Sequence, residues 1–208
     1  ALNYNFNDYF RHTRFRYTGV EHFAGQVEPG DYFSIVDISS MYLRTPLCKR
    51  MLKYMVFKDA FKEGRGAWGV HSRLPFGAAL SPFYASVVSA ECADILRNRG
   101  RRAWQHLQKR RKRLSAKRFR GWCRKNAHEH AFARWGEKAK ATCYVDDIGL
   151  AGSERECAAA VRELVALLAR LGLPAIDKDG TWEPRQSAKF LGIWFNTVAP
   201  HPHVKGAF

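Results

Sequence analysis

Residues 141–151 read Ala-Thr-Cys-Tyr-Val-Asp-Asp-Ile-Gly-Leu-Ala, with two adjacent acids inside a run of strand-forming residues. This pattern predicts a β-hairpin that carries Asp146 and Asp147 at its tip. Hairpin turns usually contain Asn-Gly or Asp-Gly, and adjacent carboxylates repel each other unless a cation neutralises them. The stretch therefore favours a cation-binding tip, although Asp-Asp pairs also occur at ordinary solvated turns.

A third acid, Asp37, ends a second predicted strand, residues 32–38, which follows the turn-like residues 28–31. If the two strands are neighbours in one sheet, the three carboxylates converge on one volume. Hard cations such as Mg²⁺ prefer oxygen ligands, and phosphoryl transfer uses two such ions about 3.5 to 4 Å apart. Alone, Asp37 fits a strand-end acid equally well.

Three separate segments resemble, in the right order, the palm motifs of reverse transcriptases. Residues 37–47 (Asp-Ile-Ser-Ser-Met-Tyr-Leu-Arg-Thr-Pro-Leu) resemble the first motif and residues 74–82 (Leu-Pro-Phe-Gly-Ala-Ala-Leu-Ser-Pro) the second, while residues 144–147 resemble the third. Lys178 is similar to the lysine of the fourth motif, and residues 190–193 are similar to the hairpin near the primer end. Among subfamilies the match leans towards gypsy-type or tyrosine-recombinase retrotransposons.

The resemblance covers residues 31–196 and implies an RNA-directed DNA polymerase. Such an enzyme adds dNTPs to a primer on an RNA or DNA template with two Mg²⁺ ions, or Mn²⁺ in their place. The implied metal ligands are Asp37, Asp146, Asp147 and the backbone carbonyl of Ile38. Lys178 would join the catalytic set by protonating the departing pyrophosphate, but among its polar neighbours it also fits a solvated hairpin.

The resemblance also implies contacts to the incoming nucleotide by Tyr42, Phe76 and Gly77, and to nucleic acid by Tyr144. A bulky ring at Tyr42 leaves no room for a 2′-hydroxyl and therefore selects deoxynucleotides. An RNA-templated RNA polymerase, which shares the three acids, would need a small or polar residue there. Gly77 permits close backbone approach, and it fits a simple turn equally well.

Two helices are predicted around these motifs. Ser81-Pro82 indicates a helix start, with serine as the cap and proline at the first position. The apolar face of this helix is predicted from Tyr84, Val87, Val88, Cys92, Ile95 and Leu96. A second helix begins at Ser153, where Ser153 and Glu156 form a capping box, and ends at Gly172. Residues 50–74 are expected to contain strands around a glycine-rich turn.

The segment 97–140 holds 17 of the 35 Lys and Arg residues and only two acids. It fits either a solvated insertion or an arm that follows a phosphate backbone. Its aromatic residues Trp104, Phe119, Trp122, Phe132 and Trp135 would stack on bases in the second reading. The nucleic-acid-binding residues predicted here are Lys109, Arg110, Arg111, Lys112, Arg113, Lys117, Arg118 and Arg120.

The length of 208 residues predicts one compact unit, and the formal net charge of +16 predicts a polyanionic partner. The resemblance implies that this unit has an α+β fold. We expect residues 1–30 to be a residual fingers or feeder segment. Residues 31–208 would form the palm of a right-hand polymerase, an antiparallel sheet backed by helices, with the basic helical insertion 97–140. Arg11, Arg14 and Arg16 match no motif of the fingers. The sequence reads as an excerpt, so fingers, thumb and ribonuclease H domains are expected elsewhere in a parent polyprotein.

Composition limits the remaining classes. No apolar run of 18 residues and no signal peptide is visible, so we expect an intracellular protein without a membrane partner, in nucleus or cytoplasm. Five scattered cysteines do not form a disulfide framework. A further alternative to a polymerase is a non-catalytic nucleic-acid-binding module from a decayed retroelement.

Overall fold

A four-stranded antiparallel sheet forms the centre of the protein. The computed structural model describes residues 20–58 and 67–198, and the backbone of residues 203–206. The sheet has the order β4-β5-β1-β6 and consists of β1 (Tyr32–Ile38), β4 (Ala141–Tyr144), β5 (Asp147–Gly152) and β6 (Ala175–Ile176). The predicted hairpin is β4–β5, and the predicted first strand β1 pairs with β5 in antiparallel register. The expected mixture of helices and antiparallel sheet is confirmed.

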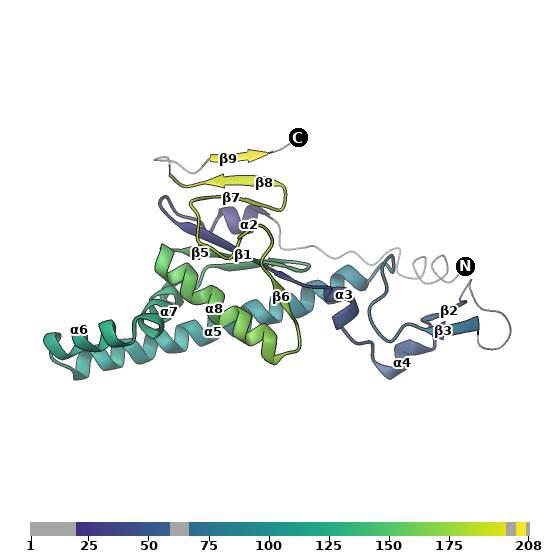
Figure 1. The fold of residues 1–208 in the computed structure, drawn as a ribbon, viewed down its shortest axis with the longest axis horizontal. Coiled ribbons are helices and arrows are strands. Elements are labelled where there is room, and N and C mark those ends of the chain that lie inside the picture. Colours follow the sequence, from purple (N-terminus) through teal and green to yellow (C-terminus); the bar gives the residue numbers. More distant parts are fainter. Residues whose placement is uncertain (1–19, 59–66, 199–202, 207–208) are drawn as a thin grey trace.

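Three helices cover one face of this sheet: α5 (Ser81–Arg113), α7 (Ala127–Lys138) and α8 (Glu154–Arg170). Figure 1 shows them together below the sheet. Val36 and Ile148 point into the core that the helices share, and neither is exposed. Because side chains alternate along a strand, the odd-numbered neighbours on β1 and β5 face the opposite side.

That opposite face carries a smaller, aromatic cluster. Phe23 of α2 (Val20–Ala24) and Phe33 of β1 pack there against Phe190 and Phe195, which belong to β7 (Ser187–Phe190) and β8 (Ile193–Asn196). The ring centroids of Phe23 and Phe190 are 5.0 Å apart. With β9 (His203–Gly206), the strands β7 and β8 form a second antiparallel sheet.

The segment that links β1 to α5 contains short elements: α3 (Met41–Arg44), α4 (Lys49–Leu52), β2 (Val56–Lys58) and β3 (Trp68–Val70). Strands β2 and β3 pair in antiparallel fashion, so the strands expected in this region are confirmed. Arg11, Arg14 and Arg16 lie outside the described residues. One more helix, α6 (Ala116–Lys125), lies between α5 and α7.

The predicted start and end of α8 are both confirmed. Ser153 and Glu156 form the capping box, with the Ser153 amide donating to Glu156 Oε2 at 3.2 Å. Gly172 follows the helix with a φ of 71°, a left-handed conformation that glycine adopts without steric cost.

The predicted start of α5 is right, but its cap is wrong. The helix begins at Ser81, and the Ser81 hydroxyl donates to the carbonyl of Pro75 at 2.7 Å instead of capping the helix. This bond joins the helix to the loop that precedes it. Serine can therefore mark a helix start while its side chain bonds elsewhere.

The predicted apolar face of α5 is also partly wrong. Tyr84 and Val87 are 42% and 49% exposed, whereas Ala85 and Ser89 are completely buried. Small residues point towards the sheet and the other helices because they let α5 approach closely. The larger apolar residues were therefore a misleading guide to the buried face.

The helices α5 and α7 touch through their backbones where Gly100 and Gly136 meet. A Cβ atom on Gly136 would lie 2.0 Å from the carbonyl oxygen of Gly100, far inside van der Waals contact. Both positions therefore require glycine at this separation of the helices.

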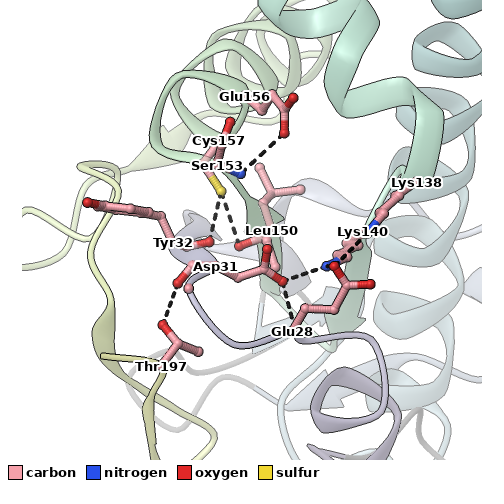
Figure 2. Close-up of polar contacts among 12 residues, drawn as sticks. Glu28, Asp31, Tyr32, Lys138, Lys140, Leu150, Ser153, Glu156, Cys157 and Thr197 are labelled. Atoms are coloured by element: carbon pink, nitrogen blue, oxygen red, sulfur yellow. Dashed lines mark hydrogen bonds and ion pairs between the residues drawn. The ribbon is translucent and has the colours of Figure 1, made fainter. Parts of the chain in front are cut away.

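A buried ion pair joins the end of α7 to the start of β1. Lys140 Nζ lies 2.6 Å from Asp31 Oδ2, and the two side chains are only 8% and 11% exposed. Figure 2 shows Glu28 beside them, 3.2 Å from Lys140 and 2.5 Å from the exposed Lys138. The Glu28 amide also donates to Asp31 Oδ2 at 2.8 Å. These contacts fix the point at which the basic segment rejoins the sheet.

None of the helices in the described part of the chain is long and apolar enough to cross a membrane.

Candidate active site

Asp37 and Asp147 lie directly opposite each other on neighbouring strands. They are Cα partners in the antiparallel register of β1 and β5. Residues opposed in this way point to the same face, with Cβ atoms about 4.5 to 5.5 Å apart. The face is the one that also carries Ile35 and Gly149, away from α5 and α8. The sheet register therefore brings two of the three predicted acids together.

Asp146 lies next to them, in the two-residue turn of the β4–β5 hairpin. The Ile38 amide donates to its carbonyl oxygen at 2.9 Å, which ties the turn to the end of β1. The preceding residue, Val145, has a φ of 50°. This left-handed conformation is strained for a β-branched residue, and hairpins usually place glycine there. Such strain persists only where the surroundings enforce it.

Ser89 helps to hold this turn, and sequence reasoning missed it. Its completely buried hydroxyl on α5 donates to the Val145 carbonyl, and it also lies within hydrogen-bonding distance of the Ala85 carbonyl. A serine on an otherwise apolar helix face was the only signal in the sequence. Ser89 is therefore a positioning residue for the acidic turn.

Burial raises the pKa of two acids of this cluster, Asp146 and Asp147. Burial, followed by the charges of Asp146 and Asp37, raises the pKa of Asp147 from 3.8 to about 6. Burial and the Asp37 charge also raise the pKa of Asp146. A site that makes its carboxylates hard to ionise gains stability from any cation that enters it.

Lys178 supplies one positive charge to this cluster. Its ammonium lies 2.5 Å from Asp37 Oδ2, and this hydrogen bond raises the pKa of Lys178. Its side chain is 58% exposed, whereas that of Asp37 is 6% exposed. The structure thus places the fourth predicted catalytic residue against the first.

The donor chemistry of the site suits Mg²⁺, because carboxylates are the ligands that this ion prefers. Among the described residues, however, no three His, Cys, Asp or Glu side chains are already grouped closely enough to hold a metal ion. An ion that used Asp37 would share that carboxylate with Lys178 or displace the ammonium. The roles of the three acids and of the Ile38 carbonyl in metal binding stay predictions.

The residues predicted to contact the nucleotide lie on α3 and on the loop before α5, which meet. The rings of Tyr42 and Phe76 are 4.8 Å apart between centroids, with planes inclined at 36°. Tyr42 packs against the main core, the cluster of buried residues between the central sheet and helices α5, α7 and α8. Phe76 is 68% exposed. Gly77 has a φ of 81°, so this position requires glycine for the backbone conformation alone.

The predicted nucleic-acid contacts divide into two groups. Tyr144 is half-buried on β4 beside the acidic turn and packs against the main core. The eight predicted cations are all exposed on the last turns of α5 and on α6. They lie on different elements from the acids.

The expectation that all five aromatic residues of the basic segment stack on bases is wrong. Phe132 and Trp135 are buried in the main core, with ring centroids 5.8 Å apart. The burial follows from the position of α7 between α5 and α8. These two rings therefore hold the segment to the protein.

Comparison with known proteins adds information on the fold only. No family model and no curated protein matches the sequence. A solved foamy viral protease-reverse transcriptase in complex with double-stranded DNA is 15% identical, with a TM-score of 0.56 over 93% of this chain. A foamy viral protease-reverse transcriptase in complex with an RNA/DNA hybrid is 17% identical, with a TM-score of 0.52 over 88%.

This chain spans only 25% and 18% of the lengths of those two proteins. The likeness extends through 93% and 88% of this chain. It is a likeness of structure at low sequence identity. The chain has a reverse-transcriptase-like fold.

Proposed function

We propose that this chain is the palm of an RNA-directed DNA polymerase from a retroelement, which adds dNTPs to the 3′ end of a primer. The observation that carries this proposal is the register that opposes Asp37 to Asp147, with Asp146 in the adjoining turn. The Leu-Pro-Phe-Gly sequence at residues 74–77 favours an element of the gypsy or tyrosine-recombinase type. The reverse-transcriptase-like fold supports the same class.

The side chains of the cluster suit the chemistry of nucleotidyl transfer. Two Mg²⁺ ions would activate the primer hydroxyl and stabilise the charge on the triphosphate. Asp37, Asp146 and Asp147 would hold them, because each presents a carboxylate at the same end of the sheet. Ser89 keeps Asp146 in place through the Val145 carbonyl.

Lys178 is suited to the leaving-group side of the reaction. Its ammonium already lies beside Asp37, so it is close to the position where the triphosphate would bind. A lysine there can donate a proton to the pyrophosphate oxygen as the bond to the α-phosphorus breaks. Its 58% exposure leaves it free to turn from Asp37 towards a phosphate.

Tyr42 and Phe76 would select the sugar. Tyr42 is supported from behind by the core and from the side by Phe76, so its ring cannot easily move aside. We expect Tyr42→Ala to incorporate rNTPs more readily relative to dNTPs. Unchanged selectivity would contradict this gate, and a preference of the unaltered chain for rNTPs would favour the alternative of an RNA-templated RNA polymerase.

Primer extension on poly-rA/oligo-dT with dTTP and Mg²⁺ tests the main proposal. The chain and a longer natural polypeptide that contains it are each compared with their Asp146→Asn variants. Asp94→Asn is the matched control, because Asp94 is an exposed acid on α5 that pairs only with Arg97 among the described residues. Extension that survives Asp94→Asn and disappears with Asp146→Asn is the expected result.

Retained extension by the Asp146→Asn variant would refute the metal site. No extension by any wild-type form would favour the second candidate, a non-catalytic nucleic-acid-binding module. The uncompensated cations of α5 and α6 are the observation that favours that candidate. Its binding would be indifferent to Mg²⁺ and to the three acids.

A further inference from the structure

The end of α5 and all of α6 form a helical projection, residues 101–125, which we name the basic arm. At 1.5 Å per residue, the 33-residue helix α5 is about 50 Å long. Ser89 contacts the acidic turn, so Lys109 lies about 30 Å further along the same helix. Figure 1 shows α6 beside the end of α5 at one extremity of the molecule. The arm is thus remote from the acids.

The arm also lies on the helix side of the central sheet. Helix α5 packs against the face that carries Val36 and Ile148, whereas Asp37 and Asp147 point to the other face. A nucleic-acid segment on the arm would therefore be a different segment from the one at the acids.

The aromatic rings of the arm are occupied by contacts within the protein. Phe119 and Trp122 stack on each other, with centroids 6.4 Å apart, and the guanidinium of Arg110 lies 4.5 Å above the Trp122 ring. Trp104 is covered by Arg134 at 5.1 Å. None of these rings is among the exposed large apolar side chains of the described residues. The rings are half-buried, and the faces that stack or are covered by a guanidinium are not available to bases or to lipid tails.

The cations of the arm, in contrast, have no acidic partners among the residues that the structure describes. The sequence from 101 to 125 contains twelve Lys and Arg residues and no Asp or Glu. No ion pair joins any of the twelve to an acid elsewhere in the described part of the chain. Eleven of them, all but the stacked Arg110, form an exposed cationic surface with no internal neutralisation.

This charge arrangement opposes the stability of the helices that carry it. Like charges three and four residues apart repel each other along α5 and α6. Lys117 and Arg118 lie in the first turn of α6, at the positive end of its dipole, where no acid is present. A polyanion would relieve both effects.

The arm is already helical without a ligand, and it is anchored at its base. The contact between Gly100 and Gly136 joins α5 to α7, and Ser115 accepts a hydrogen bond from the Arg118 amide to start α6. A surface that is already ordered binds without the entropic penalty of folding on its ligand. This separates the arm from a disordered basic tail.

We propose that the basic arm binds the phosphate backbone of a nucleic acid at a second site, independent of base sequence and of the three acids. Rigid spacing and exposed cations suit phosphates along a strand. The absence of free rings argues against single-strand recognition by base stacking. An anionic membrane is the other polyanionic surface, and the arm has no unoccupied apolar face to insert into it.

The test compares two triple variants of equal charge change. The arm variant is Arg111→Gln, Lys112→Gln and Lys117→Gln, and the control is Arg155→Gln, Arg162→Gln and Arg170→Gln on α8, all exposed residues. Binding to fluorescent duplex DNA, single-stranded DNA and an abasic phosphodiester strand is measured by anisotropy in EDTA across a salt series. EDTA separates this test from the proposed metal-dependent activity.

We expect the arm variant to bind duplex at least tenfold more weakly at 0.1 M salt, with the slope of log affinity against log salt reduced by about 2 to 3. The abasic strand should bind as tightly as ordinary single-stranded DNA, and the control variant should bind almost as tightly as the wild type. Equal losses in both variants would overturn the proposal, because net charge alone would then explain binding. So would a marked preference for strands that carry bases.

Sedimentation with phosphatidylserine vesicles provides the last outcome. Vesicle binding that the arm variant loses, while its binding to nucleic acid is unchanged, would assign the arm to a membrane and refute the proposal. Thermal unfolding should show that both variants are folded, since only exposed side chains are changed, and the arm variant should be at least as stable as the wild type because charge repulsion within the arm is reduced.

Discussion

Replacing Gly136 by alanine should separate two helices that now touch. The new Cβ would lie 2.0 Å from the Gly100 oxygen and 2.1 Å from its carbonyl carbon. Ordinary contact begins near 3.4 Å, so the backbones must part by about 1.4 Å in a closely packed interior. Overpacking of this kind costs about 3 kcal/mol, offset by about 1 kcal/mol from the better helix propensity of alanine.

The expected net loss is about 2 kcal/mol, which lowers Tm by about 4 to 8 °C for a protein of this size. Gly121→Ala is the matched control, because Gly121 is a helical glycine on α6 with no atom within 4 Å of the added Cβ. It should gain about 0.5 to 1 kcal/mol and raise Tm. Calorimetry of both variants decides the matter. A Gly136→Ala variant as stable as Gly121→Ala would show that the helices do not meet at this point.

Three further changes test other contacts. In EDTA, the unfolding free energy of the wild type should fall as pH rises from about 4 through 6, because the raised pKa of Asp147 means that the folded state binds its proton more tightly than the unfolded state. Asp147→Asn should remove this fall. Parallel pH profiles of unfolding free energy for the two proteins would contradict this. Ser89→Ala should lower kcat more than it raises KM for dNTP, because the Val145 carbonyl of the turn loses its hydrogen-bond donor, a loss that costs about 1 to 3 kcal/mol for a buried group. The control Ser86→Ala should retain activity, because the Ser86 hydroxyl donates to the Pro82 carbonyl within α5. Lys140→Met should cost about 3 to 5 kcal/mol of unfolding free energy, because its buried carboxylate partner loses its counter-ion. Lys138→Met removes only an exposed ion pair, so it should cost far less than Lys140→Met. Similar denaturation midpoints for the two variants would refute a buried pair.

The strands that carry the acids could be predicted because their signals are local. The hairpin at residues 141–151 and the strand at residues 32–38 were visible from β-forming runs on either side of turn residues. The capping box at Ser153 was visible for the same reason, since both partners lie within one turn. The antiparallel arrangement followed from the resemblance to reverse transcriptases, and the fold confirms it.

The contacts that could not be predicted join residues far apart in the chain. The hydrogen bond from Ser89 to Val145 and the ion pair between Asp31 and Lys140 depend on packing that no local pattern encodes. The buried face of α5 was misjudged because burial there follows small size, which hydropathy does not reward. Trp135 looked like a stacking residue until the position of α7 placed it in the core.

The contact between Gly100 and Gly136 also gives the molecule a modular design. The segment between Gly100 and Gly136 projects from the rest of the protein, and its two ends meet where these glycines are in contact. Only its inner turns, which carry Phe132 and Trp135, contribute to the core. The outer part can therefore be lengthened, shortened or transplanted as a cassette without altering the path of the strands. Insertion at such a closed junction adds a new surface while the rest of the fold is retained.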